Sequence, residues 1–250
     1  MWVQLGNSLI ALILGYLARY FWSFYHNKRR SAGQAAIFSG LVGPTKFVFP
    51  PREEVASAFL PRISIEDFMA INNIISAYIF AGLNPPSKVV DSRNLSETDK
   101  RQNNLILICS SKTNTATAEA LRRLKDENSA KAQLIPDFEK EQKTGRIHIK
   151  WKSGIFPSET FDQKGPVYND IAIIVKTRSP WAGQYKILVI AGIRGIGTWG
   201  AAEFLKKWWK PLYQKKVGKK TGDFAALVKV QYEDYDIKSV ELLDLVDIDN

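Results

Sequence analysis

Residues 187–205 read ILVIAGIRGIGTWGAAEFL, and this stretch decides the fold class that the sequence predicts. It begins with a continuous aliphatic run, which is typical of a strand buried on both faces of a sheet. A glycine-rich turn follows, in which Gly195, Gly197 and Gly200 form the pattern G-x-G-x-x-G, and then a helix starts. A buried strand that passes through a glycine turn into a helix is the repeating unit of α/β proteins, so the stretch predicts a sheet covered by helices.

Strand and helix patterns alternate along the rest of the chain. Strands are expected at residues 46–50, 88–91, 104–109, 171–175, 186–191, 224–231 and 240–248, and helices at residues 64–81, after residue 115 and after residue 195. Strands that alternate with helices are usually parallel. The pattern therefore predicts an α/β fold over residues 45–250, a Rossmann-like three-layer domain with a mostly parallel sheet.

The N-terminal residues have the composition of a membrane-spanning helix. Residues 2–25 are almost wholly apolar or aromatic, carry Arg19 as their only formal charge, and are long enough to cross a hydrocarbon core. No basic residue precedes them, whereas Lys28, Arg29 and Arg30 follow at once, which argues against a cleaved signal peptide and places this side in the cytoplasm. We expect a transmembrane signal-anchor helix at residues 1–27, a basic neck at 28–44, and a cytoplasmic C-terminal domain of a single-pass protein of the cell membrane. A buried N-terminal helix of a soluble protein is the alternative.

The glycine turn lacks one requirement of a dinucleotide site. Such a site has an acidic residue about twenty residues further on, at the end of the next strand. Here the next strand begins near Phe224, so Glu233 and Asp234 at its end lie too far along the chain. Nicotinamide or flavin binding is therefore disfavoured, and the cofactor stays unassigned. A turn remains in which the backbone can approach an anion; the alternative is that its glycines serve tight turning and packing alone.

A second polar turn follows the strand at residues 104–109. It contains two serines, Lys112, Thr113 and Asn114, but it lacks the spaced glycines of a Walker A sequence. An anion or nucleotide contact is one interpretation, and a solvated loop with Asn114 or Thr115 as the helix N-cap is the other. Because carboxyl ends of parallel strands meet at one edge, Lys112, Arg194 and Arg178 are expected to form a positive mouth there. The predicted ligand-binding residues are Ser110, Ser111, Lys112, Thr113, Asn114, Arg178, Gly192, Arg194, Gly195, Gly197 and Thr198.

Composition excludes several kinds of chemistry. The chain has one cysteine, Cys109, which excludes an internal disulfide, and two histidines far apart, His26 and His148, which argue against a zinc site or a histidine-based triad. We assign no catalytic residue and no metal ligand, and this absence favours binding over catalysis. The formal net charge is +10, but the basic residues are concentrated in residues 28–30 and 204–220.

Residues 204–220 interleave lysines with Trp208, Trp209, Leu212 and Tyr213. Three interpretations stay open. The segment is a helix that covers the sheet with its aromatic residues inward, a surface that contacts the membrane or another subunit, or a nucleic-acid site. Nucleic acid is the least favoured of these partners.

The N-terminal span, the basic neck and the polar loops at Leu105 to Asn114 and Ile187 to Ala201 resemble the membrane effectors of prokaryotic antiviral signalling. Those effectors join a transmembrane segment to a nucleotide-sensing domain of the CARF or a related Rossmannoid type. The resemblance implies a cyclic or linear nucleotide as ligand, and it makes a membrane-anchored nucleotide sensor the leading hypothesis. A membrane-tethered enzyme that acts on a nucleotide or nucleotide-derived cofactor, and a scaffold for protein partners, are the alternatives. Whether the protein forms a homo-oligomer is left open.

Overall fold

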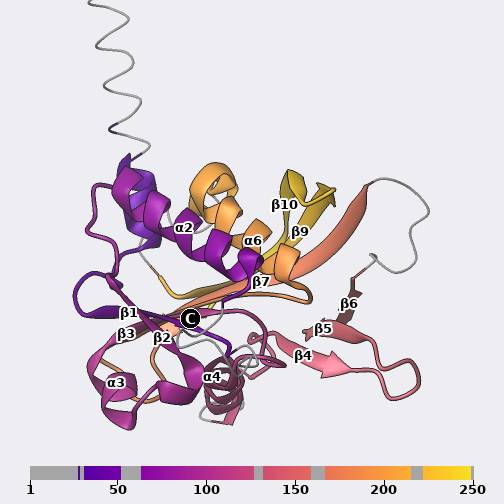
Figure 1. Ribbon diagram of the computed structural model, residues 1–250, viewed down its shortest axis with the longest axis horizontal. Helices are drawn as coiled ribbons and strands as arrows, with labels where there is room; N and C mark the ends of the chain where they lie inside the picture. Colours follow the sequence, from indigo (N-terminus) through magenta and orange to yellow (C-terminus); the bar gives the residue numbers. More distant parts are fainter. Residues whose placement is uncertain are drawn as a thin grey trace, which may run out of the picture.

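The computed structural model describes residues 28, 31–51, 63–126, 132–158, 167–214 and 222–248. In these residues the chain forms a seven-stranded sheet with helices on both faces, and a small three-stranded sheet beside it (Figure 1). The elements are β1 (Thr45–Phe49), α2 (Ile65–Phe80), β2 (Lys88–Asp91), η1 (Ser92–Asn94), α3 (Glu97–Gln102), β3 (Asn104–Ile108), α4 (Thr115–Asp126), β4 (Asp137–Lys140), β5 (Ile147–Trp151), β6 (Gly154–Pro157), β7 (Tyr168–Arg178), β8 (Lys186–Gly192), α6 (Gly195–Glu203), the π-helix η3 (Phe204–Trp208), α7 (Lys210–Leu212), β9 (Phe224–Glu233) and β10 (Asp236–Asp247).

The large sheet is mixed, so the expected mostly parallel, Rossmann-like sheet is wrong. Its strands lie in the order β10-β9-β7-β8-β3-β1-β2. The four strands β8, β3, β1 and β2 are parallel to one another. Beyond this parallel core, β7, β9 and β10 each run antiparallel to their neighbours.

Two short connections explain why the pairs β7–β8 and β9–β10 of the large sheet are antiparallel. Residues 179–185 join β7 to β8, and a turn at Asp234 and Tyr235, with positive φ angles of 46° and 64°, joins β9 to β10. A parallel pair needs a crossover of about a dozen residues or more, whereas two consecutive left-handed residues are typical of a tight hairpin turn. The sequence pattern did not predict these hairpins, because a buried apolar run has the same composition in a parallel and in an antiparallel pair.

Two hydrophobic cores lie on opposite faces of the sheet. In β3, Ile106 and Ile108 belong to the core under α2 and α6, whereas Leu105 and Leu107 belong to the core under α4. All four side chains are fully buried. Successive side chains of a strand point to opposite faces, so a continuous aliphatic run serves both cores.

The small sheet, in the order β4-β5-β6, is an insertion between α4 and β7 that was not expected from the sequence. Its inward side chains Phe138, Ile149 and Trp151 join the core under α4. The Trp151 ring nitrogen donates to the Leu134 carbonyl at 2.9 Å, which satisfies its polar group in this core. The insertion therefore lies on the face of the large sheet opposite to α2 and α6.

The N-terminal part of the described chain packs onto the domain. Residues 31–37 are helical, and Ile37, Phe38 and Leu41 are fully buried. These three residues of the basic neck belong to the core under α2 and α6. The expected membrane-spanning segment, residues 2–25, lies outside the described residues. No helix in the part of the chain that the structure describes is long and apolar enough to cross a bilayer.

Candidate functional site

Parallel strands of the sheet end at one common edge, which we call the carboxyl edge. Ile108 at the end of β3 pairs with Ile190 of β8, so the turn at residues 109–114 lies beside the turn at 193–194. The Cys109 N–H donates to the Ile190 carbonyl at 3.0 Å and holds the two turns together. β2, which follows β1 in the chain, lies on one side of β1, whereas β3 and β8, which come later, lie on its other side. The direction in which successive strands are added to the sheet therefore reverses between β1 and β3, and we call this reversal of the winding the switch point. In open α/β sheets, ligands bind outside the carboxyl ends at such a reversal.

The turn between β3 and α4 presents polar groups at this edge. Cys109 has a φ angle of 81°, in the left-handed region that non-glycine residues rarely adopt. Its Sγ lies 3.0 Å from the Thr113 Oγ1, and the Thr113 N–H donates to the Ser110 carbonyl at 3.1 Å. Ser110 is buried, Ser111 is half-buried, and Lys112 and Thr113 are exposed. An ammonium group and hydroxyl groups therefore lie at the N-terminus of α4.

Asn114 holds this turn in place through contacts inside the protein. It is completely buried. Its side-chain nitrogen donates to the carbonyls of Ile108 and Val48 at 2.7 and 3.2 Å. Its side-chain oxygen accepts from the N–H groups of Ala116 and Thr117 at 3.0 and 3.2 Å, so Asn114 is the N-cap of α4. All four hydrogen-bonding positions of this amide are used within the chain, which leaves none for a ligand.

The glycines of the second turn lie against the protein's own atoms. A Cβ atom at Gly192 would lie 2.4 Å from the Thr198 nitrogen, and one at Gly197 would lie 2.3 Å from Oδ2 of Asp170. A Cβ atom at Gly195 would meet a side chain of α2 at 3.0 Å. The Thr198 hydroxyl is also used internally, because it accepts from the Gly192 N–H at 2.9 Å. Close packing within the turn thus accounts for the need for glycine at these positions.

Asp170 supplies an internal anion to the N-terminus of α6. Its Oδ2 accepts from the N–H groups of Arg194 and Gly197, each at 3.0 Å, and its Oδ1 accepts from the Ile171 N–H at 2.9 Å. Burial raises the pKa of this carboxyl to about 6, although the hydrogen bonds from the Arg194 N–H and the Ser158 hydroxyl oppose the rise. A phosphate bound to this turn would need the same donors, which already have a carboxylate acceptor.

Arg178 lies at the opposite edge of the sheet from the two turns. It pairs with Lys186 at the start of β8, whereas Gly192 at the end of β8 lies at the carboxyl edge. At about 3.3 Å per residue, the two edges are about 20 Å apart along β8. The structure therefore brings Lys112 and Arg194 to one edge but does not bring Arg178 there. The expectation of a common positive mouth assumed a parallel β7, and β7 is antiparallel to β8.

Two residues near the carboxyl edge, Asp170 and Cys109, have an environment that the sequence did not predict. No role was assigned to Asp170 from the sequence, and its position directly before an apolar run was the available signal. Cys109 directly follows an aliphatic run, a context that favours a buried side chain, yet it is half-buried and its backbone is left-handed. Among the residues that the structure describes, no group of three or more His, Cys, Asp or Glu side chains could hold a metal ion.

No family model, curated protein or solved structure matches the chain. The resemblance to membrane effectors of antiviral signalling stays a prediction. A functional assignment therefore depends on the residues and the geometry of the carboxyl edge.

Proposed function

We propose that the protein is a membrane-anchored sensor that binds a phosphate-bearing nucleotide at the turn between β3 and α4. The observation that carries the proposal is the position of this turn, which follows a parallel strand where the winding reverses between β1 and β3. Ser111, Lys112 and Thr113 supply hydroxyl groups and an ammonium group, which bind phosphate oxygens well. The N-terminus of α4 adds partial positive charge at the same place.

The glycine turn has a supporting role in this proposal. Because Asp170 accepts hydrogen bonds from the Arg194 and Gly197 N–H groups, the phosphate is assigned to the neighbouring turn at residues 109–114. The guanidinium group of Arg194 adds a second positive charge to the carboxyl edge. Asp170 itself is fully buried, so its carboxylate is shielded from a ligand at the surface.

The membrane anchor in this proposal is supported by the sequence. Residues 2–25 carry one formal charge, and Lys28, Arg29 and Arg30 follow directly. A sodium carbonate wash of membranes from cells that express the full-length chain tests this part separately. An integral protein stays in the membrane pellet, whereas release into the supernatant would contradict the anchor.

Thermal unfolding of the full-length protein in mild detergent tests the ligand site. The melting temperature is measured with ATP, NAD, NADP and cyclic nucleotides. A ligand whose free concentration is a hundred times its Kd stabilises the folded protein by about 2.7 kcal/mol. For a chain of this size, this stabilisation raises Tm by roughly 5–10 °C. We expect Lys112→Ala to reduce this shift strongly. Arg178→Ala is the matched control, because it removes a cation at the opposite edge of the same sheet.

The other outcomes separate the competing classes of function. Equal shifts in the Lys112→Ala variant and the wild type would contradict the assigned site. Stabilisation by NAD or NADP that Gly195→Ala abolishes would place a dinucleotide at the glycine turn instead. Turnover of a stabilising ligand would identify a tethered enzyme, and no shift with any nucleotide would favour a protein-binding scaffold.

A further inference from the structure

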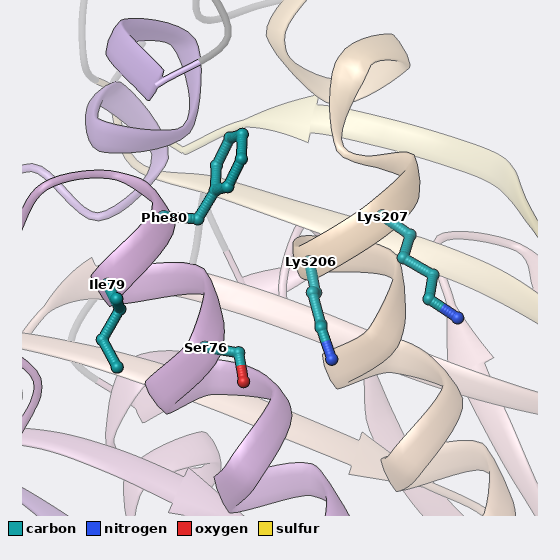
Figure 2. A pocket seen from close by; sticks show the side chains of 5 residues that line it. All are labelled: Ser76, Ile79, Phe80, Lys206 and Lys207. Carbon is teal, nitrogen blue, oxygen red and sulfur yellow. The ribbon is translucent and has the colours of Figure 1, made fainter. Parts of the chain in front are cut away.

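A groove lies on the helical layer between the C-terminal end of α2 and η3 (Figure 2). It has a volume of about 430 Å³ and is lined by Ser76, Ile79, Phe80, Lys206 and Lys207. Ile79 and Phe80 are 63% and 43% exposed, which is high for large apolar side chains. Figure 2 shows Ser76 and Lys206 directed toward the space between the two helices. The groove therefore combines exposed apolar groups with cationic groups.

Positive charge dominates the rim of this groove. The Lys206 ammonium donates to the side-chain oxygen of Asn73 at 3.0 Å, a neutral partner that does not balance its charge. Lys207 forms an ion pair with Glu203, yet its side chain remains 54% exposed. Lys210, one turn further on, is exposed as well. Exposed apolar side chains beside lysines are typical of surfaces that bind anionic membranes.

The helix at residues 31–37 lies directly against η3. The Gln34 side-chain nitrogen donates to the carbonyls of Leu205 and Lys206 at 2.9 and 3.2 Å. Gly33 lies so close to the Trp209 ring that a Cβ atom there would be 2.6 Å from it. The first part of the described chain is therefore fixed beside the segment that forms one wall of the groove.

Chain length limits how far the end of the apolar N-terminal stretch can be from this helix. Tyr25 is the last residue of that stretch, and residues 26–30 separate it from Ser31. A fully extended chain spans at most about 3.6 Å per residue, so the six steps from Tyr25 to Ser31 cover at most about 22 Å. When a bilayer holds residues 2–25, its headgroups are consequently within reach of the groove.

We propose that the groove between α2 and η3 docks the domain onto an anionic membrane surface, an inference that rests on the membrane anchor of the proposed function. Ile79 and Phe80 enter the boundary between headgroups and acyl chains, and the neighbouring lysines contact lipid phosphates. A second copy of the chain fits this surface less well. A two-fold contact through the groove would bring the lysines of both copies together, and like charges across an interface repel.

Electron paramagnetic resonance of the full-length chain in vesicles tests this proposal. A nitroxide label is attached at Ile79→Cys in a Cys109→Ala background, since Cys109 is the only cysteine. The control label is at Ile155→Cys on β6, which is 64% exposed and belongs to the insertion on the opposite face of the large sheet. The vesicles consist of phosphatidylcholine with or without phosphatidylglycerol. Accessibility of each label to oxygen and to a water-soluble nickel complex is compared.

With phosphatidylglycerol, we expect the label at position 79 to become accessible to oxygen and shielded from nickel, while the control label stays in water. Each basic residue near an anionic surface contributes about a fivefold factor, so Lys206→Gln combined with Lys207→Gln should lower the docking equilibrium by roughly thirtyfold. Lys150→Gln on β5 is the matched charge control and should change nothing.

Three results would overturn the proposal, and they differ from one another. A label at position 79 that stays in water in both lipid mixtures, while the protein remains with the vesicles, contradicts docking but leaves the anchor intact. A protein that does not associate with vesicles contradicts the anchor itself. Shielding that persists in detergent and grows with protein concentration identifies a second copy of the chain as the occupant.

Discussion

Replacing Asp170 with asparagine should change how the stability of this protein depends on pH. The Asp170 carboxylate is fully buried and accepts backbone hydrogen bonds from Arg194, Gly197 and Ile171. Burial raises its pKa from 3.8 to about 6. The folded state therefore holds a proton on this group over a pH range in which the unfolded state has released it. Between these two pKa values, stability falls as the pH rises.

The size of the effect follows from the two pKa values. A rise from 3.8 to about 6 corresponds to about 3 kcal/mol of stability that is present below pH 4 and lost above pH 6. An asparagine cannot titrate, so this component disappears in Asp170→Asn. The amide also turns a donor toward one of the backbone N–H groups, which leaves a buried donor unpaired at a cost of about 1–3 kcal/mol at every pH. The variant should therefore lose more stability relative to wild type at pH 4 than at pH 7.

Thermal unfolding of both proteins between pH 4 and pH 7 measures this difference. For a chain of this size, about 3 kcal/mol corresponds to roughly 6–12 °C in Tm. The other carboxylates titrate in both proteins, so their contribution cancels in the difference between the two Tm values at each pH. Asp234→Asn, at an exposed position of the turn between β9 and β10, is the control and should follow the wild type. Equal pH dependence in wild type and Asp170→Asn would refute the reasoning.

Two further predictions concern close approaches at glycines and are measured by thermal unfolding. Gly33→Ala places a Cβ atom 2.6 Å from the Trp209 ring and should cost about 1–3 kcal/mol. Gly183→Ala, with no atom within 4 Å, should leave Tm unchanged, and equal losses in both would contradict the packing of residues 31–37. Gly200→Ala places its Cβ 2.4 Å from Cγ1 of Val230 and should cost a similar amount. In a double-mutant cycle, Val230→Ala should relieve part of this loss, whereas strict additivity would argue against the contact.

Hydrophobic patterning located most elements of the large sheet. The expected strand at residues 104–109 is β3 (Asn104–Ile108), and the expected helix at 64–81 is α2 (Ile65–Phe80). In α2, Ser64 is the N-cap, and its hydroxyl accepts from the Asp67 N–H at 3.1 Å. Such features are predictable because periodicity and capping depend on residues a few positions apart. The insertion β4–β6 was not predicted, because its short strands mix charged and apolar residues.

The candidate site was predictable only in part. The two turns were found because polar and glycine residues directly follow aliphatic runs. Their environment could not be found in this way, since Asp170 is 24 residues from Arg194 in the sequence. Nor could the sequence place Arg178, because its position depends on the direction of β7.

The sequence by itself determined the strands of the large sheet, the helices α2, α4 and α6, and the polar turns between them, because the apolar pattern of each of these segments depends on its own residues. Only the tertiary structure decided the direction of β7, β9 and β10, which depends on how short connections close between strands. It also decided that Asp170 meets the glycine turn while Arg178 lies at the far edge. Both follow from one antiparallel pairing, between β7 and β8, that no local pattern encodes.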